Sequence, residues 1–99
     1  MSVQYNFEWD SKKAIRNLLK HGISFEKASQ VFKDPLAATV YDEDHSSNDD
    51  ERWVTLGQID GQFYVVVVHT YHEQHCLIRI RIISARPANK HEIEQYQQG

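Results

Sequence analysis

Arginine alternates with isoleucine late in the chain, in the segment RIRIISAR at positions 79–86. A period of two is typical of a strand with one solvated face and one buried face. Guanidinium groups held in register on a sheet suit phosphate oxygens, because each is permanently charged and offers a planar fork of donors. The segment therefore indicates an anion-binding strand. The alternative is an edge strand whose arginines only keep it in solution.

Three arginines are candidates for a phosphate clamp. Arg81 comes first because it projects from the alternating strand, although it could instead pair with an acidic loop. Arg86 has the opposite parity, so the two cannot share a face of a regular strand, and only a bend before Pro87 would return it to that face. Arg52 begins a strand after the acidic loop, and it either completes the cationic cluster or pairs with a neighbouring acid.

Histidine is the natural candidate for proton transfer near neutral pH. His69 is the best placed, at the end of the expected central strand, but it could equally be a satisfied interior histidine. Together with His72, His75 and Cys76 it matches no closed zinc pattern, so we predict no metal and no other cofactor. Tyr96 could donate a proton, although its helical spacing favours a core role.

Further residues are candidates for substrate binding. Lys20 and His21 end an expected helix, where cations also suit the helix dipole without any ligand. Arg79 lies on the alternating strand, and Trp53 could stack on a base, as could Trp9. Both tryptophans flank apolar runs, so a core role is the alternative for each.

Composition limits the class of protein. Ninety-nine residues predict one domain, residues 1–99, and a lone cysteine fits a reducing compartment. The chain has no signal-like leader and no apolar run near 20 residues, so we expect a cytoplasmic protein that does not cross a membrane. The net charge is −3, but six of the fourteen acids fall within residues 42–51, and the remainder, with eleven basic and eight acidic side chains, is +3. The body is thus mildly basic.

The expected elements follow from periodicity and from turn signals. We predict strands at 3–9, 38–41, 52–59, 62–71 and 77–85, with turns at Asp60-Gly61 and at 72–75. A first helix begins at Asp10 or Ser11, carries the apolar stripe Ala14, Ile15, Leu18 and Leu19, and stops at Gly22. A second helix, capped by Ser24, ends at Asp34-Pro35, and a third opens at Asn89 with Glu92 as its capping-box partner. The order predicts an α+β fold, an antiparallel sheet of four to five strands with two N-terminal helices and one C-terminal helix. We expect the helices to cover one face of the sheet and leave the other open.

Several short motifs together resemble one family. They are FEWD at 7–10, KHGISF at 20–25, VFKDP at 31–35, ERW at 51–53 with Leu56-Gly57, His69-Thr70 and RIISAR at 81–86. Their order resembles that of BrnT-type toxins, the toxin half of type II toxin–antitoxin modules, over about residues 7 to 96. Ser11 stands where that family often has proline, at a position that concerns helix initiation.

The resemblance implies a RelE-like fold and a ribonuclease that inhibits translation. It also implies a BrnA-type antitoxin that covers the toxin, with the complex bound to promoter DNA through the antitoxin. RNA carries its own nucleophile, the 2′-hydroxyl, so the protein needs a base, an acid and cations at the phosphate, and no metal. Removing one such preorganised group typically costs on the order of 100-fold in rate. The alternative function is a non-catalytic module that uses the same basic face to bind a protein or nucleic acid.

Overall fold

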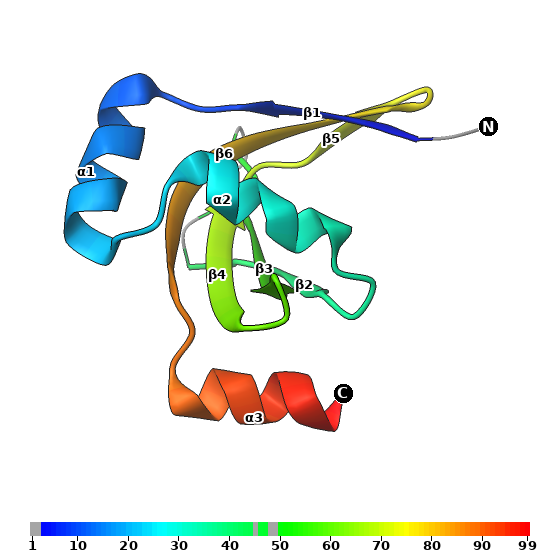
Figure 1. Cartoon of the computed structure of the whole chain (residues 1–99). Helices are drawn as coiled ribbons and strands as arrows, with labels where there is room; N and C mark the ends of the chain where they lie inside the picture. The colour runs from blue at the N-terminus through cyan, green and yellow to red at the C-terminus, as the bar shows by residue number, and fades with distance from the viewer. Residues whose placement is uncertain (1–2, 45, 48–49) are drawn as a thin grey trace.

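A computed structural model describes residues 3–44, 46–47 and 50–99. The elements run in the order β1 (Gln4–Glu8), α1 (Ser11–His21), α2 (Phe25–Ala28), the 3-10 helix η1 (Ser29–Lys33), β2 (Ala38–Tyr41), β3 (Trp53–Ile59), β4 (Phe63–His69), β5 (His72–Gln74), β6 (Leu77–Pro87) and α3 (Lys90–Gln98) (Figure 1). The α+β class is confirmed, and so are the three helical regions.

The sheet has six strands in the order β1-β6-β4-β3-β2, with β5 also paired to β6. All pairs are antiparallel except β1 with β6, which is parallel. The expected antiparallel sheet is thus confirmed except at this edge, and it has six strands where four to five were expected. The turn between β5 and β6 lies beside the start of β1, where the Gln4 N–H donates to the Cys76 carbonyl at 2.9 Å, so β6 leaves that turn in the direction of β1.

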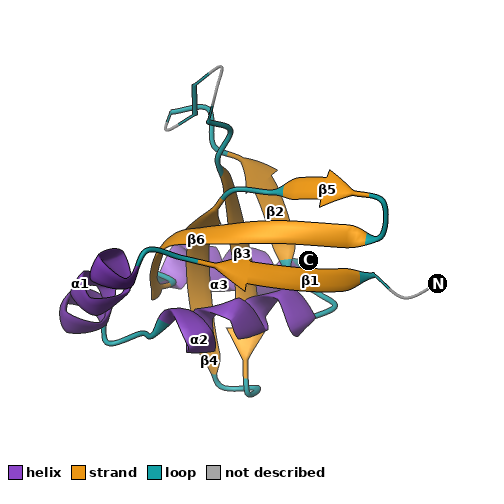
Figure 2. Cartoon of the chain, turned by 90° about the horizontal axis from the view of Figure 1, so that it is seen from above, coloured by secondary structure: helices purple, strands orange, loops and turns teal. Residues whose placement is uncertain are grey.

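Strand β6 is the hub of this sheet. Its first half lies between β1 and β5, and its second half pairs with β4. Figure 2 shows β1, β6 and β5 side by side, running across β3 and β4. The predicted turn at 72–75 was wrong in part, because residues 72–74 pair with β6 as a short strand. The turn itself is made at His75, whose φ of 57° opens the left-handed region that a tight hairpin needs.

The core lies between the sheet and the α2–η1 segment. Phe25, Ala28 and Val31 are fully buried against alternate residues of β3, β4 and β6. Gly57 belongs to this contact: a Cβ there would lie 3.0 Å from the Val31 Cβ. The periodic face predicted for the second helix is thus confirmed, and close packing explains why β3 carries a glycine at its middle.

Helix ends follow the predicted caps. The Asp10 carboxylate accepts from the backbone N–H groups of Lys12 and Lys13, and Gly22 closes α1 with a φ of 72°. Asn89 and Glu92 form the capping box of α3. None of the helices in the described residues combines the length and apolar composition that spanning a bilayer requires.

Helix α3 occupies the face of the sheet opposite to α2. The residues Ala38, Val40, Val54, Leu56 and Val66 point away from the core and line a groove with Glu92, Gln95 and Tyr96 of α3. In Figure 1, α3 lies apart from the other helices, at the far end of β6. The expectation that all helices share one face was wrong. Polar and ring contacts attach α3 instead: Tyr96 donates to Asp34 at 2.6 Å, and Tyr64 packs edge-on against Tyr96.

Candidate nucleic-acid interface

A β-bulge in β6 determines which arginines share a face. Val68 pairs with Ser84, whereas the next residue, His69, pairs with Ile82, so Ile83 is the extra residue. Before the bulge Ile80 and Ile82 face the core, and after it Ala85 does, each at most 1% exposed. The bulge therefore places Arg86 on the same outer face as Arg81. Sequence parity alone had forbidden this.

The outer face can be followed row by row through the strand register. Val54, Val68 and Ser84 form one row, and Leu56, Val66 and Arg86 form the next. On the other side, Thr70 donates its backbone N–H to Arg81 at 2.9 Å. Extending the register by one residue sets Arg52 opposite Thr70. The Cα atoms of Arg52 and Arg81 are then two strand spacings apart, roughly 10 Å.

Two of these three arginines hold carboxylates. Arg86 makes a two-pronged ion pair with Glu92, at 2.8 and 2.9 Å, which lowers the pKa of Glu92. Arg52 contacts Asp50 at 3.1 Å. Arg81 is exposed and makes no ion pair within the described ranges. The open cation of the predicted clamp is thus Arg81.

Helix α1 brings four more basic side chains to the bulge. A groove lined by Lys13, Arg16, Asn17, Lys20, His21, Ile83 and Ser84 lies between α1 and β6, and we call it the bulge groove. The predicted residues Lys20 and His21 therefore do meet β6. Lys13, Arg16 and Ser84 were not predicted, although the absence of any acid from positions 11–21 was a signal that could have found the two basic residues.

A buried asparagine fixes this contact. The Asn17 amide donates to the carbonyl of Ala85 at 2.9 Å and to that of Ile23 at 3.0 Å, and its oxygen accepts from the Ala85 N–H at 3.0 Å. β1 pairs with β6 only as far as Arg81, and at Ala85 the Asn17 amide supplies the donor and the acceptor that a neighbouring strand would provide. Asn17 thus attaches α1, one wall of the groove, directly to the backbone of β6.

Asp10 lies where the groove meets Arg81. Backbone N–H groups of Lys13 and Lys12 lower the pKa of its carboxyl, and the nearby charges of Lys13 and Arg81 act in the same direction. Arg81 therefore lies near the N-terminus of α1, beside the groove. With Arg86 past Ser84, the groove has a guanidinium at either side along β6.

The remaining predicted residues lie elsewhere. His69 is 1% exposed, with Nε2 2.7 Å from the Thr55 hydroxyl and Nδ1 2.9 Å from the carbonyl of Thr70. Burial lowers its pKa. This environment matches the alternative of a satisfied interior histidine, and it leaves no surface for a substrate.

Trp53 and Arg79 are also outside the groove. Trp53 is half-buried, with its ring edge-on to Tyr41 at 5.2 Å. Arg79 shares the outer face of β6 with Arg81 but lies farther from the bulge, opposite His72 and Asn6. Trp9 packs against Phe25 in the core.

The acidic stretch and the histidine-rich hairpin lie outside the bulge groove. The acidic stretch 42–51 includes His45, Asn48 and Asp49, which lie outside the described residues. Among the residues that are described, no three histidine, cysteine, aspartate or glutamate side chains gather closely enough to bind a metal.

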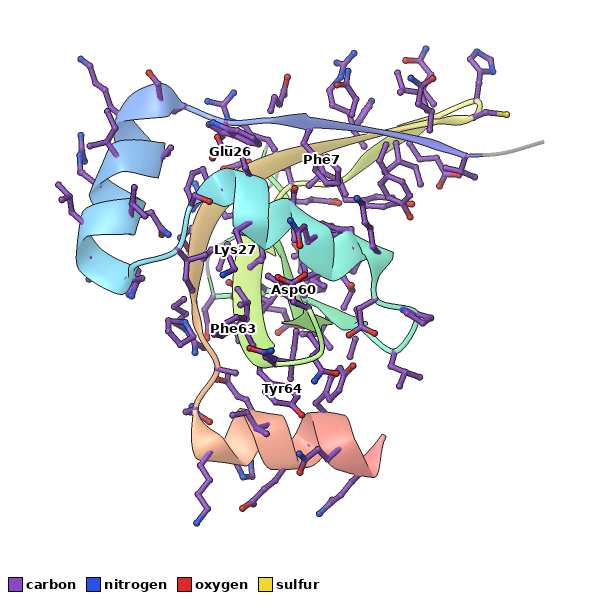
Figure 3. The ribbon with its side chains drawn as sticks, in the orientation of Figure 1. Phe7, Glu26, Lys27, Asp60, Phe63 and Tyr64 are labelled. Atoms are coloured by element: carbon purple, nitrogen blue, oxygen red, sulfur yellow. The ribbon has the colours of Figure 1, made fainter. Side chains whose placement is uncertain are left out.

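Another basic side chain is held by an aromatic ring outside the bulge groove. Lys27 of α2 lies over the Phe63 ring of β4, with its ammonium 4.3 Å from the ring centroid (Figure 3). The bulge groove gathers four basic side chains, and we take it as the candidate site for an anionic polymer.

Comparisons with known proteins agree with this architecture. A family model described as the ribonuclease toxin BrnT of a type II toxin–antitoxin system matches residues 9–92. The 1.1 Å crystal structure of the Brucella abortus ribonuclease toxin BrnT superposes with a TM-score of 0.63 and 21% identity, covering 89% of this chain and all of that one. No curated protein matched the sequence significantly.

Proposed function

The chain belongs to the BrnT family of ribonuclease toxins of type II toxin–antitoxin systems, and we propose that it binds the RNA backbone across the bulge groove. As a member of that family it is an endoribonuclease with a cognate antitoxin and an RNA target. We propose which residues bind and cleave the RNA, and that residues 1–99 form one domain. The assignment of residues rests above all on the β-bulge at Ile83, which gives Arg81, Ser84 and Arg86 a common face beside Lys20 and His21.

Binding follows from charge. Lys13, Arg16 and Lys20 line the groove, and no acid does. Phosphate contacts of this kind position a nucleic acid without reading its sequence. We therefore assign Lys20 and Arg16 to the RNA backbone and Arg81 to the scissile phosphate. Ser84, at the centre, can donate its hydroxyl to a phosphate oxygen.

Cleavage in this proposal uses the 2′-hydroxyl of the RNA. Its oxygen attacks the adjacent phosphorus, the bond to the 5′-oxygen breaks, and a cyclic phosphate remains on the 5′ fragment. Arg81 stabilises the charge that develops on the phosphoryl oxygens. His21 is a histidine that lines the groove, so we assign to it the proton of the attacking 2′-hydroxyl, which it then passes to the departing 5′-oxygen. His69, enclosed in the core, receives a structural role.

No step in this scheme requires a metal ion, so cleavage should persist in EDTA. We expect Arg81→Ala to reduce the rate about 100-fold and Lys20→Ala to weaken RNA binding. Lys33→Ala is the matched control, since Lys33 is also an exposed lysine in the last turn of a helix, outside the groove.

The assay is the rate of cleavage of an end-labelled RNA by the purified toxin. Full-length RNA that survives in EDTA but is cut with Mg²⁺ would overturn metal independence. Wild-type rates for both Arg81→Ala and Lys20→Ala would overturn the site. His21→Gln should lower the rate of cleavage, and a wild-type rate would remove His21 from the mechanism.

The cellular role extends the same proposal. Cleavage of cytoplasmic RNA would inhibit translation, and the antitoxin would carry the complex to promoter DNA. Expression of the toxin with radiolabelled methionine should show protein synthesis falling, and the Arg81→Ala variant should leave synthesis intact. Continued synthesis with active wild-type toxin would contradict the translational role.

A further inference from the structure

Helix α1 presents an apolar stripe to solvent. Ile15, Leu18 and Leu19 are 61%, 50% and 82% exposed, although their spacing had predicted a stripe of the kind that packs on a core. Ala14 and Asn17 face the body of the protein instead, because the Asn17 amide serves the edge of β6. Three large exposed aliphatic side chains on one helical face are typical of an interaction surface.

The charges beside the stripe restrict what can bind there. At about 100° per residue, Lys12 and Arg16 lie directly next to the stripe, and Lys20 and Lys13 follow around the helix. Positions 11–21 contain no acid, and these four side chains are all exposed. A partner that covers the stripe must bring negative charge to this border.

A second copy of the chain does not meet this requirement. Pairing α1 with α1 would bring four positive side chains against four others. An amphipathic helix with an apolar face and acidic flanks does meet it, because the i, i+3, i+4 spacing of the stripe is what a packed helix contacts.

We propose that the apolar stripe of α1 is the docking site for an acidic amphipathic helix of the cognate antitoxin. The consequence for regulation rests on the proposed function, since Arg16 borders the stripe and also lines the bulge groove. Acidic side chains of the docked helix pair with Arg16 and Lys12. They thereby occupy a cation that RNA needs, and the helix obstructs the groove.

The decisive variants are Leu19→Asp and Lys12→Glu, neither of which lines the groove. Leu19→Asp is expected to weaken binding of the purified antitoxin at least tenfold, and Lys12→Glu should weaken it and reduce its dependence on salt. Leu36→Asp is the matched control, because Leu36 is 72% exposed and belongs to the loop between η1 and β2. RNA cleavage by each isolated variant should stay within about twofold of wild type, which also shows that it folds.

The outcomes separate the two proposals. Wild-type antitoxin affinity for both Leu19→Asp and Lys12→Glu overturns the docking site, whatever the nuclease assays show. If the wild-type toxin without antitoxin sediments as a dimer and the Leu19→Asp variant as a monomer, the stripe is a contact between two copies of the chain. That result likewise overturns the docking site. If Lys20→Ala and Arg81→Ala both cleave RNA at the wild-type rate, the bulge groove is not the RNA site. Antitoxin docking on the stripe then still stands, and only the account of how docking blocks RNA is overturned.

Discussion

Replacing Asn17 with leucine should destabilise the protein far more than an ordinary substitution on a helix. The Asn17 side chain is 6% exposed and makes three hydrogen bonds, two of them with the backbone of Ala85, which is itself 0% exposed. Leucine has a similar branched shape but cannot bond to either group. Ala85 is fully buried, so its N–H and C=O would be left without their partners.

The magnitude follows from the groups left behind. An unsatisfied buried N–H or C=O costs about 1–3 kcal/mol, and both groups of Ala85 are affected. The buried leucine regains roughly 1 kcal/mol of apolar transfer. The net loss is roughly 1–5 kcal/mol, a large part of the stability of a typical domain, about 5–15 kcal/mol.

Urea unfolding followed by circular dichroism measures this loss. Asn6→Leu is the matched control, since Asn6 is exposed on β1 and no side-chain hydrogen bond is seen for it in the described part of the chain. Hydrogen exchange at the Ala85 amide should accelerate in Asn17→Leu by more than the global change in stability requires. A loss below about 0.5 kcal/mol would refute the role of Asn17 as a substitute strand.

Three further perturbations test other contacts. The hydrogen bond to Asp34 raises the pKa of Tyr96 to about 12, so Tyr96→Phe should remove the contribution of this bond to the free energy of unfolding. In the wild type that contribution is full below the ordinary tyrosine pKa and is lost as the pH rises through 12. Unfolding measured over this pH range, with tyrosine ionisation followed by absorbance, would show the loss. Burial lowers the pKa of His69, so its contribution to the free energy of unfolding is full above the ordinary histidine pKa and is lost as the pH falls through the folded value. His69→Gln should therefore make the free energy of unfolding depend less steeply on pH in the acid range, and an unaltered slope would contradict this role of His69. Gly57→Ala sets a Cβ 3.0 Å from that of Val31 and should cost about 1–3 kcal/mol by the same urea assay, a neutral result counting against close packing.

Most elements were predictable because their signals are local. The Asp10 cap, the Gly22 stop and the Asn89–Glu92 box each depend on residues within one helical turn of each other. The hairpin at Asp60-Gly61 is confirmed by positive φ at both residues. The parallel pairing of β1 with β6 was not predictable in this way, because it joins residues more than seventy positions apart.

The site was predictable only in part. Arg81, Lys20 and His21 could be named from the sequence, but the bulge that gives Arg86 the face of Arg81 has no local signature in IISA. The apolar stripe of α1 has the predicted helical spacing, but it faces solvent and not the core. Its orientation depends on Asn17, and a polar residue at that position gave no indication that it would be the buried one.

The hydrogen bonds between Asn17 and Ala85 span 68 positions of sequence, and that span bears on when the groove can form during synthesis. Until residue 85 has left the ribosome, α1 has no β6 edge to dock on and the cations of the groove are not assembled. Assembly of the groove must therefore wait until β6 has been made. A nascent chain that ends before β6 has the basic helix but not the surface that the proposed RNA site requires.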